Sequence, residues 1–445
     1  MKKILSYILV LSIGLGACKK ETEELFDKPA DERISDALRS YQTALTQAAG
    51  WKLFVYPSGL QSQDVEVGGL TYYVRFSNEN RALMVSDFTT DMATVPKESG
   101  YRLKAVQRPS LIFDTYSYIH VAADPDPDVS SSPVQQGGFG WGTDFDFSFT
   151  ETEITDTIRL EGNFNGSDAY LIKITKEEID AAFSGAMANI IDVTSDYATT
   201  TPFIVLNGTG NEKINVAFNL SLYIIEFSFV DGSGNIVTIK APFSHTINGL
   251  HLKAPITVGG ITFQDIYWDA TNLYYYILQG STKIQLTTPA TPAFSLPLTN
   301  AIGTAYQSII IPTFRLPNQS ADFVTKYNAV KTAIKNGPYN LDLNVMEFAF
   351  NAQARTMNLN VIVFQDNQGF LAQYNYTYNI TGGLFKFTLV GGNGNANLIA
   401  ADMSPLLNHI NTNTFQLSAI ATSFGVLAQF TSQQSPAFFF TGNLE

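Results

Sequence analysis

The amino-acid sequence predicts a mainly β protein of the α+β class, built from antiparallel sandwich- or barrel-like domains that are each introduced by a helix. Aromatic residues, mostly Phe and Tyr, make up 13% of the chain, and Val and Thr are also common, a composition that favours strands. Short runs of alternating apolar and polar residues recur between turn signals. Hydrophobic residues reach 45% and charged residues only 15%, which suits packed cores.

The first residues have the pattern of a secretory signal. Two lysines are followed by an apolar run that is too short to span a membrane as an ordinary helix. The tetrapeptide LGAC, which ends at Cys18, resembles the bacterial lipobox, and Cys18 is the only cysteine of the chain. That resemblance implies lipidation of Cys18, the alternative being an ordinary signal peptide with a chance cysteine. We expect a lipoprotein signal peptide over 1–17 and a lipidated tether over 18–30.

The mature part is predicted to open with a helix from about residue 31 to the glycine at 50. Ile34, Leu38 and Tyr41 form one apolar stripe at three- and four-residue spacing. Strands follow at once, and the first hairpin turns at Asn78-Glu79-Asn80. The strands expected in this part are WKLFVYP, TYYVRFS, RALMVSDF, YRLKAV, SLIFDTYSYIHV, TDFDFSF and TIRLEG.

A second helix is predicted to start at Thr175. Thr175 and Glu178 have capping-box spacing, in which each side chain accepts the other's backbone N–H. The Thr/Pro-rich stretch over 287–297 is typical of a linker or an edge segment. Between the helix and this stretch the expected strands are VAFNLSLYIIEFSF, IVTIKAPF, GLHLKAPITV, ITFQDIYW and LYYYIL.

A third helix is predicted over about 320–335, where Asn336-Gly337-Pro338 ends it. A short helix is expected near 405–410. The strands expected in this part are LDLNVMEFAF, MNLNVIVF, LAQYNYTYNI, LFKFTLV, FQLSAIA and AFFFTGN.

These elements predict an N-terminal β-rich domain over 31–295 and a C-terminal helix-plus-β domain over 296–445. A division of the first domain into two subdomains near residue 170 is an alternative. The three helices begin about 145 residues apart, a spacing that also raises internal duplication as an alternative.

Several function classes find no support in the sequence. The net charge of −13 argues against nucleic acid as a partner, because phosphate binding needs clustered Lys and Arg. A single cysteine excludes a disulfide framework and a Cys-based zinc site. The glycines of GGFGWG precede a strand and not a helix, so they predict no nucleotide site, and we expect no cofactor.

No catalytic motif stands out, so we expect that the protein is not an enzyme. No serine lies in a GxSxG setting, and the histidines lack short ligand spacing. Carboxylate pairs meet in space and not in sequence, so a hydrolase with a dispersed acidic or His/Asp site stays an alternative. Its candidate acids, none singled out by the sequence, are Asp144, Asp146, Glu151 and Asp265. The histidines, His120, His245, His251 and His409, are expected to be structural, with a metal pair of His245 and His251 as the alternative.

The candidate binding residues are aromatic and acidic. Tyr374, Tyr376 and Tyr378 alternate, so their rings share one face of a strand, which is a stacking platform if exposed and core if buried. Trp141 and Trp268 are further aromatic candidates for ligand contact. The loop DPDPDVSSSP offers weak metal ligands, although a solvated acidic loop is the plainer interpretation. Those carboxylates are Asp124, Asp126 and Asp128.

Together these motifs resemble an uncharacterised family of Bacteroidota surface lipoproteins. The resemblance rests on the lipobox, WKLFVYP, the TYYVRF and RALMV hairpin, SLIFDTYSYIH, the G-W-G-x-D-F-D-F pattern and IKAPFSHTINGLHLKAPI. It implies association with SusC/SusD-like outer-membrane uptake systems, and it carries no catalytic residue. The charged stretch KKETEE after Cys18 likewise resembles the surface-export signal of such lipoproteins.

The expected function is therefore that of an accessory protein, anchored by lipid in the outer membrane and exposed at the surface. It would bind a glycan or peptide nutrient, or a partner of a SusC/SusD-like transporter. Asn, Gln, Ser and Thr abound after Gly337, where only Arg355 and Lys386 are basic, and such a surface suits neutral ligands. A structural or adhesive surface protein is a further alternative.

Overall fold

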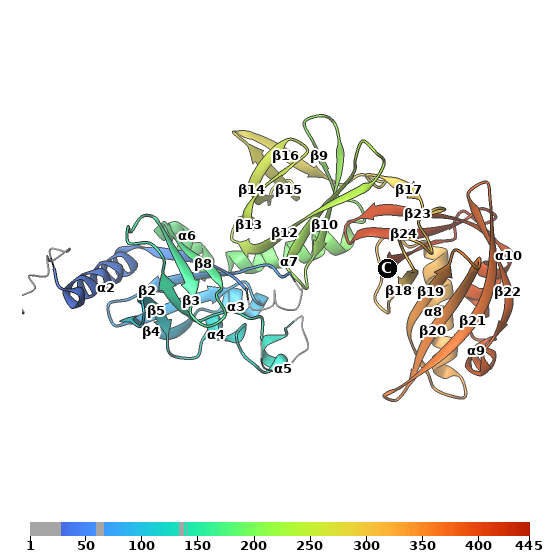
Figure 1. Ribbon diagram of the computed structural model, residues 1–445, viewed down its shortest axis with the longest axis horizontal. Helices are drawn as coiled ribbons and strands as arrows, with labels where there is room; N and C mark the ends of the chain where they lie inside the picture. Colours follow the sequence, from blue (N-terminus) through green and yellow to red (C-terminus); the bar gives the residue numbers. More distant parts are fainter. Residues whose placement is uncertain (1–27, 59–65, 133–137, 139) are drawn as a thin grey trace, which may run out of the picture.

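The computed structural model describes residues 28–58, 66–132, 138 and 140–445 (Figure 1). Within them the strands form two closed eight-stranded barrels and a nine-stranded sheet, and all pairings between the named strands are antiparallel. The predicted mainly β, antiparallel fold is thus confirmed. The three groups of strands follow one another along the chain, over residues 50–174, 205–287 and 295–444.

Barrel 1 closes because β1 pairs with both β2 and β8. Alternate residues of β1, among them Leu53 and Val55, point into its core, and Tyr41 and Leu45 of α2 pack against the same cluster. The strands are β1 (Gly50–Tyr56), β2 (Leu70–Phe76), β3 (Arg81–Ser86), β4 (Lys97–Ala105), β5 (Pro109–Phe113), β6 (Asp146–Phe149), β7 (Thr157–Gly162) and β8 (Asp168–Ile174). The helices are α2 (Ala30–Gln47), α3 (Thr90–Thr94), α4 (Tyr118–Val121) and α5 (Pro127–Ser130).

Two helices, α6 (Lys176–Phe183) and α7 (Ala186–Thr200), connect barrel 1 to barrel 2. The predicted start is confirmed, since the Thr175 hydroxyl accepts the backbone N–H of Glu178 at 3.2 Å. The return hydrogen bond of the predicted capping box is not formed, because the Glu178 carboxylate pairs with Lys52 of β1. Gly185, at φ +89°, separates these two helices where the sequence predicts one.

Barrel 2 closes because β9 pairs with both β10 and β16. Tyr197 of α7 packs into its core. The run VAFNLSLYIIEFSF, expected as one strand, is two strands joined by a turn at Tyr223, which has φ +54°. The strands are β9 (Val205–Asn207), β10 (Lys213–Asn219), β11 (Ile224–Val230), β12 (Ile236–Thr246), β13 (Gly249–Val258), β14 (Ile261–Asp269), β15 (Tyr274–Gln279) and β16 (Thr282–Thr287).

The third sheet also closes on itself. Strand β23 pairs with both β22 and β24, so the eight strands β18–β25 form a closed ring that we call ring 3. Strand β17 pairs with a later part of β23, residues 418–420. The strands are β17 (Ser295–Pro297), β18 (Ser308–Ile311), β19 (Asp342–Asn351), β20 (Thr356–Gln365), β21 (Gln368–Thr381), β22 (Leu384–Gly392), β23 (Thr414–Thr422), β24 (Gly425–Ser432) and β25 (Phe439–Leu444).

Three helices belong to ring 3. Phe323 of α8 and Ile410 of α10 pack into one core with Phe348 and Phe430 of the strands. The predicted helices near 320 and 405 are confirmed, whereas α9 and β24 are absent from the sequence-based prediction. The helices are α8 (Ala321–Asn336), α9 (Gly394–Ile399) and α10 (Ser404–Thr412).

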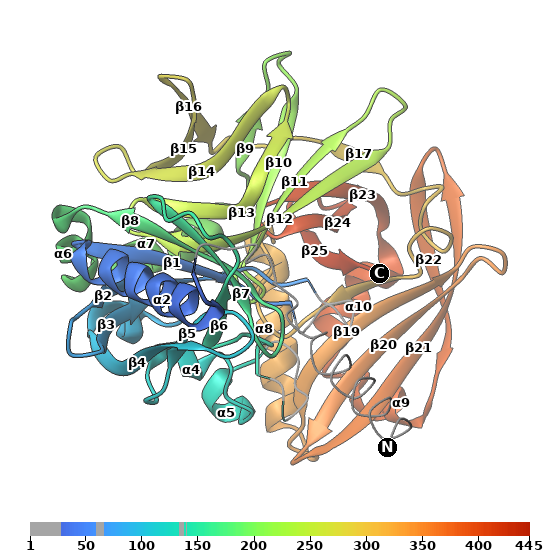
Figure 2. The ribbon, with the colours of Figure 1, turned by 60° about the vertical axis from the view of Figure 1, so that its left-hand side comes forward.

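Barrel 2 lies between barrel 1 and ring 3 (Figures 1 and 2). Hydrogen bonds tie it to both neighbours: Thr71 of barrel 1 donates to Ser244, and Phe218 donates its backbone N–H to the carbonyl of Ser423 in ring 3. Across the described part of the chain, every helix is too short or too polar to cross a bilayer.

Candidate functional site

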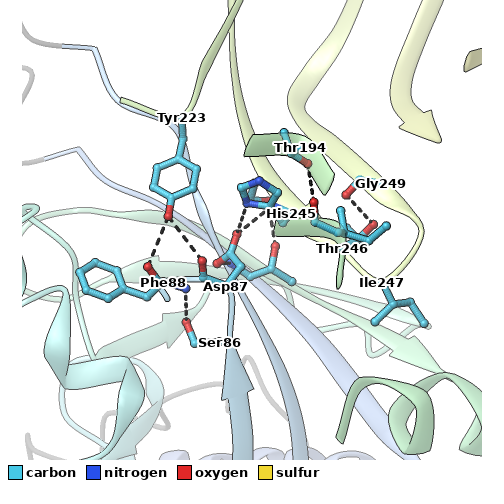
Figure 3. A network of polar contacts seen from close by, with 12 residues as sticks. Ser86, Asp87, Phe88, Thr194, Tyr223, His245, Thr246, Ile247 and Gly249 are labelled. Carbon is cyan, nitrogen blue, oxygen red and sulfur yellow. Dashed lines mark hydrogen bonds and ion pairs between the residues drawn. The ribbon is translucent and has the colours of Figure 1, made fainter. Parts of the chain in front are cut away.

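A buried polar network joins barrel 1 to barrel 2 (Figure 3). Asp87, directly after β3, is 0% exposed, and its two carboxylate oxygens accept the backbone N–H groups of Thr71 at 2.7 Å and His245 at 2.8 Å. Thr71 belongs to β2 of barrel 1 and His245 to β12 of barrel 2. Hydrogen bonds to a charged acceptor are strong, so one carboxylate fastens strands of both barrels.

The groups that Asp87 contacts are buried or half-buried. The His245 ring is 3% exposed, and its Nδ1 lies 3.5 Å from the Asp87 carboxylate. Tyr223 donates to the backbone carbonyls of Asp87 and Phe88, and burial raises the pKa of this phenol, so it stays a neutral donor. Because its acid is wholly buried, the network acts as a joint between the barrels.

A second polar chain crosses the same junction closer to the surface. The Tyr170 hydroxyl of β8 lies 2.8 Å from Nε2 of His251, whose Nδ1 lies 2.7 Å from the Asp265 carboxylate. Phe54 stacks on the imidazole with ring centroids 4.3 Å apart. Burial raises the pKa of Tyr170 to about 12, so the phenol remains protonated. Both imidazole nitrogens are thus engaged, and the Asp265 side chain is 42% exposed.

The open site lies at the other junction, between barrel 2 and ring 3. Two hollows of about 390 and 770 Å³ adjoin there and share four lining residues. We call them together the seam groove. The shared residues are Thr199, Phe314, Leu316 and Phe424.

Main-chain contacts fix the two walls of the seam groove relative to each other. The β23–β24 turn reaches into barrel 2, where Ser423 accepts from Phe218 at 2.9 Å and donates to Pro202 at 3.0 Å. The Asn215 amide donates to the carbonyl of Thr422 at 2.8 Å. A groove between bodies joined in this way is largely preformed, which lowers the entropic cost of binding.

Aromatic and amide side chains line the seam groove. Phe314 is 57% exposed at its edge. Arg315 and Glu226 are its charged lining residues, and Glu226 pairs with Lys240 at 3.6 Å. The uncharged polar lining comprises Thr199, Thr200, Asn219, Ser221, Asn318, Gln319 and Asn443.

The two tryptophan candidates pack within the barrels. Trp141 is 4% exposed, donates to the carbonyl of Ser130 and contacts the ring of Tyr223. Trp268 is half-buried, with its ring centroid 4.9 Å from that of Tyr275. Neither tryptophan lines the seam groove.

The tyrosines of β21 lie in the core of ring 3. Tyr374, Tyr376 and Tyr378 are 3%, 1% and 2% exposed, and their hydroxyls reach partners on neighbouring elements. The alternation that predicts a common face is real, but that face points inward, so it offers no stacking platform.

The acidic loop uses its carboxylates locally. Asp124 accepts the backbone N–H of Asp126, and Asp126 accepts that of Asp128, as in a turn and a helix cap. The Tyr116 hydroxyl donates to Asp124 and lowers the pKa of its carboxyl. Among the residues with described positions, no three His, Cys, Asp or Glu side chains gather in a way that would hold a metal ion. Cys18 lies outside the described residues.

The seam groove was not among the sequence-based candidates. Its walls come from residues 198–226 and 314–443, which the sequence separates by about ninety positions. A weak local signal exists in IPTFRLPNQS, where an exposed aromatic and a basic residue stand between prolines in a loop.

A family model for a domain of unknown function, DUF4302, matches residues 22–270. That span takes in barrel 1, α6 and α7, and the strands of barrel 2 as far as β14. It therefore contains the barrel junction and only one wall of the seam groove. No curated protein matches the chain.

Proposed function

Because the chain belongs to the DUF4302 family, whose domain has no assigned function, we propose a function from the seam groove and the N-terminal sequence. The protein is a lipid-anchored, surface-exposed protein of the outer membrane that captures a saccharide for a SusC/SusD-like uptake system. The observation that carries this proposal is the preformed groove, with Phe314 exposed above a lining of amides and hydroxyls.

The chemistry of the groove favours a saccharide. An exposed phenyl ring offers an apolar face to the C–H face of a sugar ring. Gln319 and Asn443 can each donate and accept, as the paired hydroxyls of a sugar require. The Asn219 oxygen already accepts from Ser221 and Leu222, and the Asn318 amide donates to Gln429, so these two offer fewer groups to a ligand. A peptide is the alternative ligand, because Leu220, Leu316 and Pro317 also line the groove and could contact apolar side chains.

The membrane part of the proposal rests on the sequence. The LGAC tetrapeptide follows an apolar run of signal-peptide length, and a triacylated Cys18 meets the requirement of more than one chain for stable anchoring. The KKETEE stretch and the resemblance to Bacteroidota lipoproteins support surface exposure and a transporter partner. Copurification of a transporter from detergent-solubilised outer membranes tests that partner, and its absence under gentle extraction would contradict it.

Glycan-array binding followed by calorimetry tests the ligand. We expect the mature protein to bind one class of oligosaccharide and Phe314→Ala to weaken that binding about tenfold or more, since the lost apolar contact is worth about 1.5–3 kcal/mol. Phe164→Ala, which removes a ring that is 92% exposed on barrel 1, is the matched control. Binding of peptides but no saccharides, or equal affinity of Phe314→Ala and the unmodified protein, would contradict the proposal.

A hydrolase acting through His251 and Asp265 is the second candidate function. The short hydrogen bond between them resembles the base-orienting pair of many hydrolases. Tyr170 occupies Nε2 of His251, so a substrate would have to displace it. Activity on saccharide or peptide libraries that His251→Ala abolishes would establish this function, and activity unchanged in that variant would exclude it.

A further inference from the structure

We propose that Arg315 makes the seam groove selective for saccharides that carry a carboxylate group. This inference rests on the proposed function and specifies its substrate class. It assigns Arg315 as a specificity-determining residue that binds the acid group while Phe314 contacts the sugar ring. The sequence alone favours a neutral ligand, so the inference comes from the surroundings of one side chain.

Arg315 has no ion pair, hydrogen bond or ring contact for its guanidinium among the residues that the structure describes. Other arginines of the chain have such partners. Arg355, for example, lies over the ring of Tyr378, with 5.7 Å from its guanidinium carbon to the ring centroid. The arginines paired with a carboxylate are Arg39, Arg75, Arg81, Arg102, Arg108 and Arg159.

The described residues of the groove offer the Arg315 guanidinium no free carboxylate as a partner. Glu226, the carboxylate that lines the same groove, pairs with Lys240 at 3.6 Å. The chain carries a net charge of −13, so an exposed arginine without an acid partner is unusual here and attracts an anionic group. A guanidinium presents two parallel N–H donors that match a planar carboxylate.

The loop that carries Arg315 is held in place by the three residues that follow it. Leu316 is 1% exposed and packs with Ile420 and Leu427 of ring 3. The next residue, Pro317, accepts a hydrogen bond from Thr441 at 2.8 Å, and Asn318 donates to Gln429 at 2.7 Å. Arg315 therefore projects from an anchored backbone, which preserves the geometry that selective binding needs.

Calorimetry with a matched pair of ligands tests the inference on the mature protein. The pair is a galacturonic acid trimer and its methyl ester, which share every ring and differ in charge. We expect the free acid to bind about tenfold to a hundredfold more tightly than the ester, and this preference to weaken with added salt. A sulfated trimer distinguishes a carboxylate site from a general anion site.

Three variants locate the preference. Arg315→Met should bring the affinities for acid and ester together, and Arg315→Lys should restore part of the preference, because lysine keeps the charge but lacks the two-donor fork. Arg108→Met is the matched control, since it removes an arginine of equal charge that pairs with Glu161 on barrel 1. We expect it to leave the preference unchanged.

The outcomes separate this inference from the proposed function. Equal binding of acid and ester, or tighter binding of the sulfated trimer, would overturn the inference while Phe314→Ala still weakened saccharide binding. Failure of every saccharide to bind, together with no effect of Phe314→Ala, would overturn the proposed function as well. A preference that Arg315→Met leaves intact would also overturn the inference.

Discussion

The carboxylate of Asp87 accepts the backbone N–H of His245 at 2.8 Å, so a side chain of barrel 1 completes the hydrogen bonding of a strand of barrel 2. The same carboxylate holds Thr71 within its own barrel. The joint is fully buried, and removing the acid leaves two backbone donors without a partner.

Asp87→Ala should therefore lower the free energy of unfolding by about 3 kcal/mol and loosen the barrel junction. Asp87→Asn keeps one acceptor oxygen, so it should lower the free energy of unfolding less than Asp87→Ala does. Urea denaturation measures the first effect, and limited proteolysis between the barrels measures the second. Glu79→Ala, in an exposed hairpin turn, is the control, and equal stability of Asp87→Ala and this control would contradict the joint.

Because the β21 tyrosines lie in the core, substitutions of Tyr376 should lower the free energy of unfolding, and by more as more of the side chain is removed. Tyr376→Phe removes the hydrogen bond to Asn411 and should cost about 1 kcal/mol. Tyr376→Ala also leaves a cavity and should cost about 3–5 kcal/mol. Denaturation midpoints check both values, and an alanine variant of unchanged stability that loses ligand binding would instead favour an exposed platform.

The pH dependence of stability should include a contribution from His120. Burial lowers the pKa of this imidazole below its usual value of 6.5, so the unfolded chain binds the proton more readily than the folded protein. The free energy of unfolding then decreases as the pH falls below about 6.5, and this decrease ends once the pH is below the pKa of His120 in the folded protein. NMR titration of the His120 ring should give a midpoint below 6.5.

Denaturation between about pH 8 and about pH 5 checks the same point, because His120→Asn should flatten this part of the stability profile. His409, whose pKa burial also lowers, retains its own contribution in that variant and serves as the internal reference. A His120 midpoint above 6.5 would contradict the account.

Lipidation of Cys18 predicts that the protein leaves the membrane fraction of the cell when the sulfur of this residue is replaced. Cys18→Ser removes the acceptor of the acyl chains, so the protein should leave the membrane fraction of the cell. Phase separation in detergent and mass spectrometry of the mature N-terminus measure the change. A serine variant that stays with membranes as before would exclude the anchor.

The sequence predicts a helix or a turn well where a short local pattern is enough to specify its backbone. The apolar stripe through Tyr41 places α2, and Asn78-Glu79-Asn80 places the β2–β3 turn. The turn at Tyr223 escapes prediction, because a tyrosine at φ +54° is unusual and the Asn219 side chain that caps the turn lies inside an otherwise strand-like run. Closure of the barrels and of ring 3 is likewise set by long-range pairings.

The functional regions depend still more on tertiary contacts. Asp87 and His245 are unremarkable in the sequence, and only the junction of two barrels makes them neighbours. The seam groove needs Thr199 beside Phe314 and Phe424, which no spacing rule connects. The alternating tyrosines gave a correct face but not its direction, because an alternating strand of a closed ring can bury either side.

The central claim is that the seam groove holds the ligand, and filling the groove tests it most directly. Thr199 lines both hollows, so Thr199→Trp should block the groove while it leaves Phe314 and Arg315 in place. Thr43→Trp, on the exposed face of α2, is the matched control. The account predicts that calorimetry with the oligosaccharide found by array screening detects binding to the control but not to Thr199→Trp; equal affinity of the two variants would contradict it.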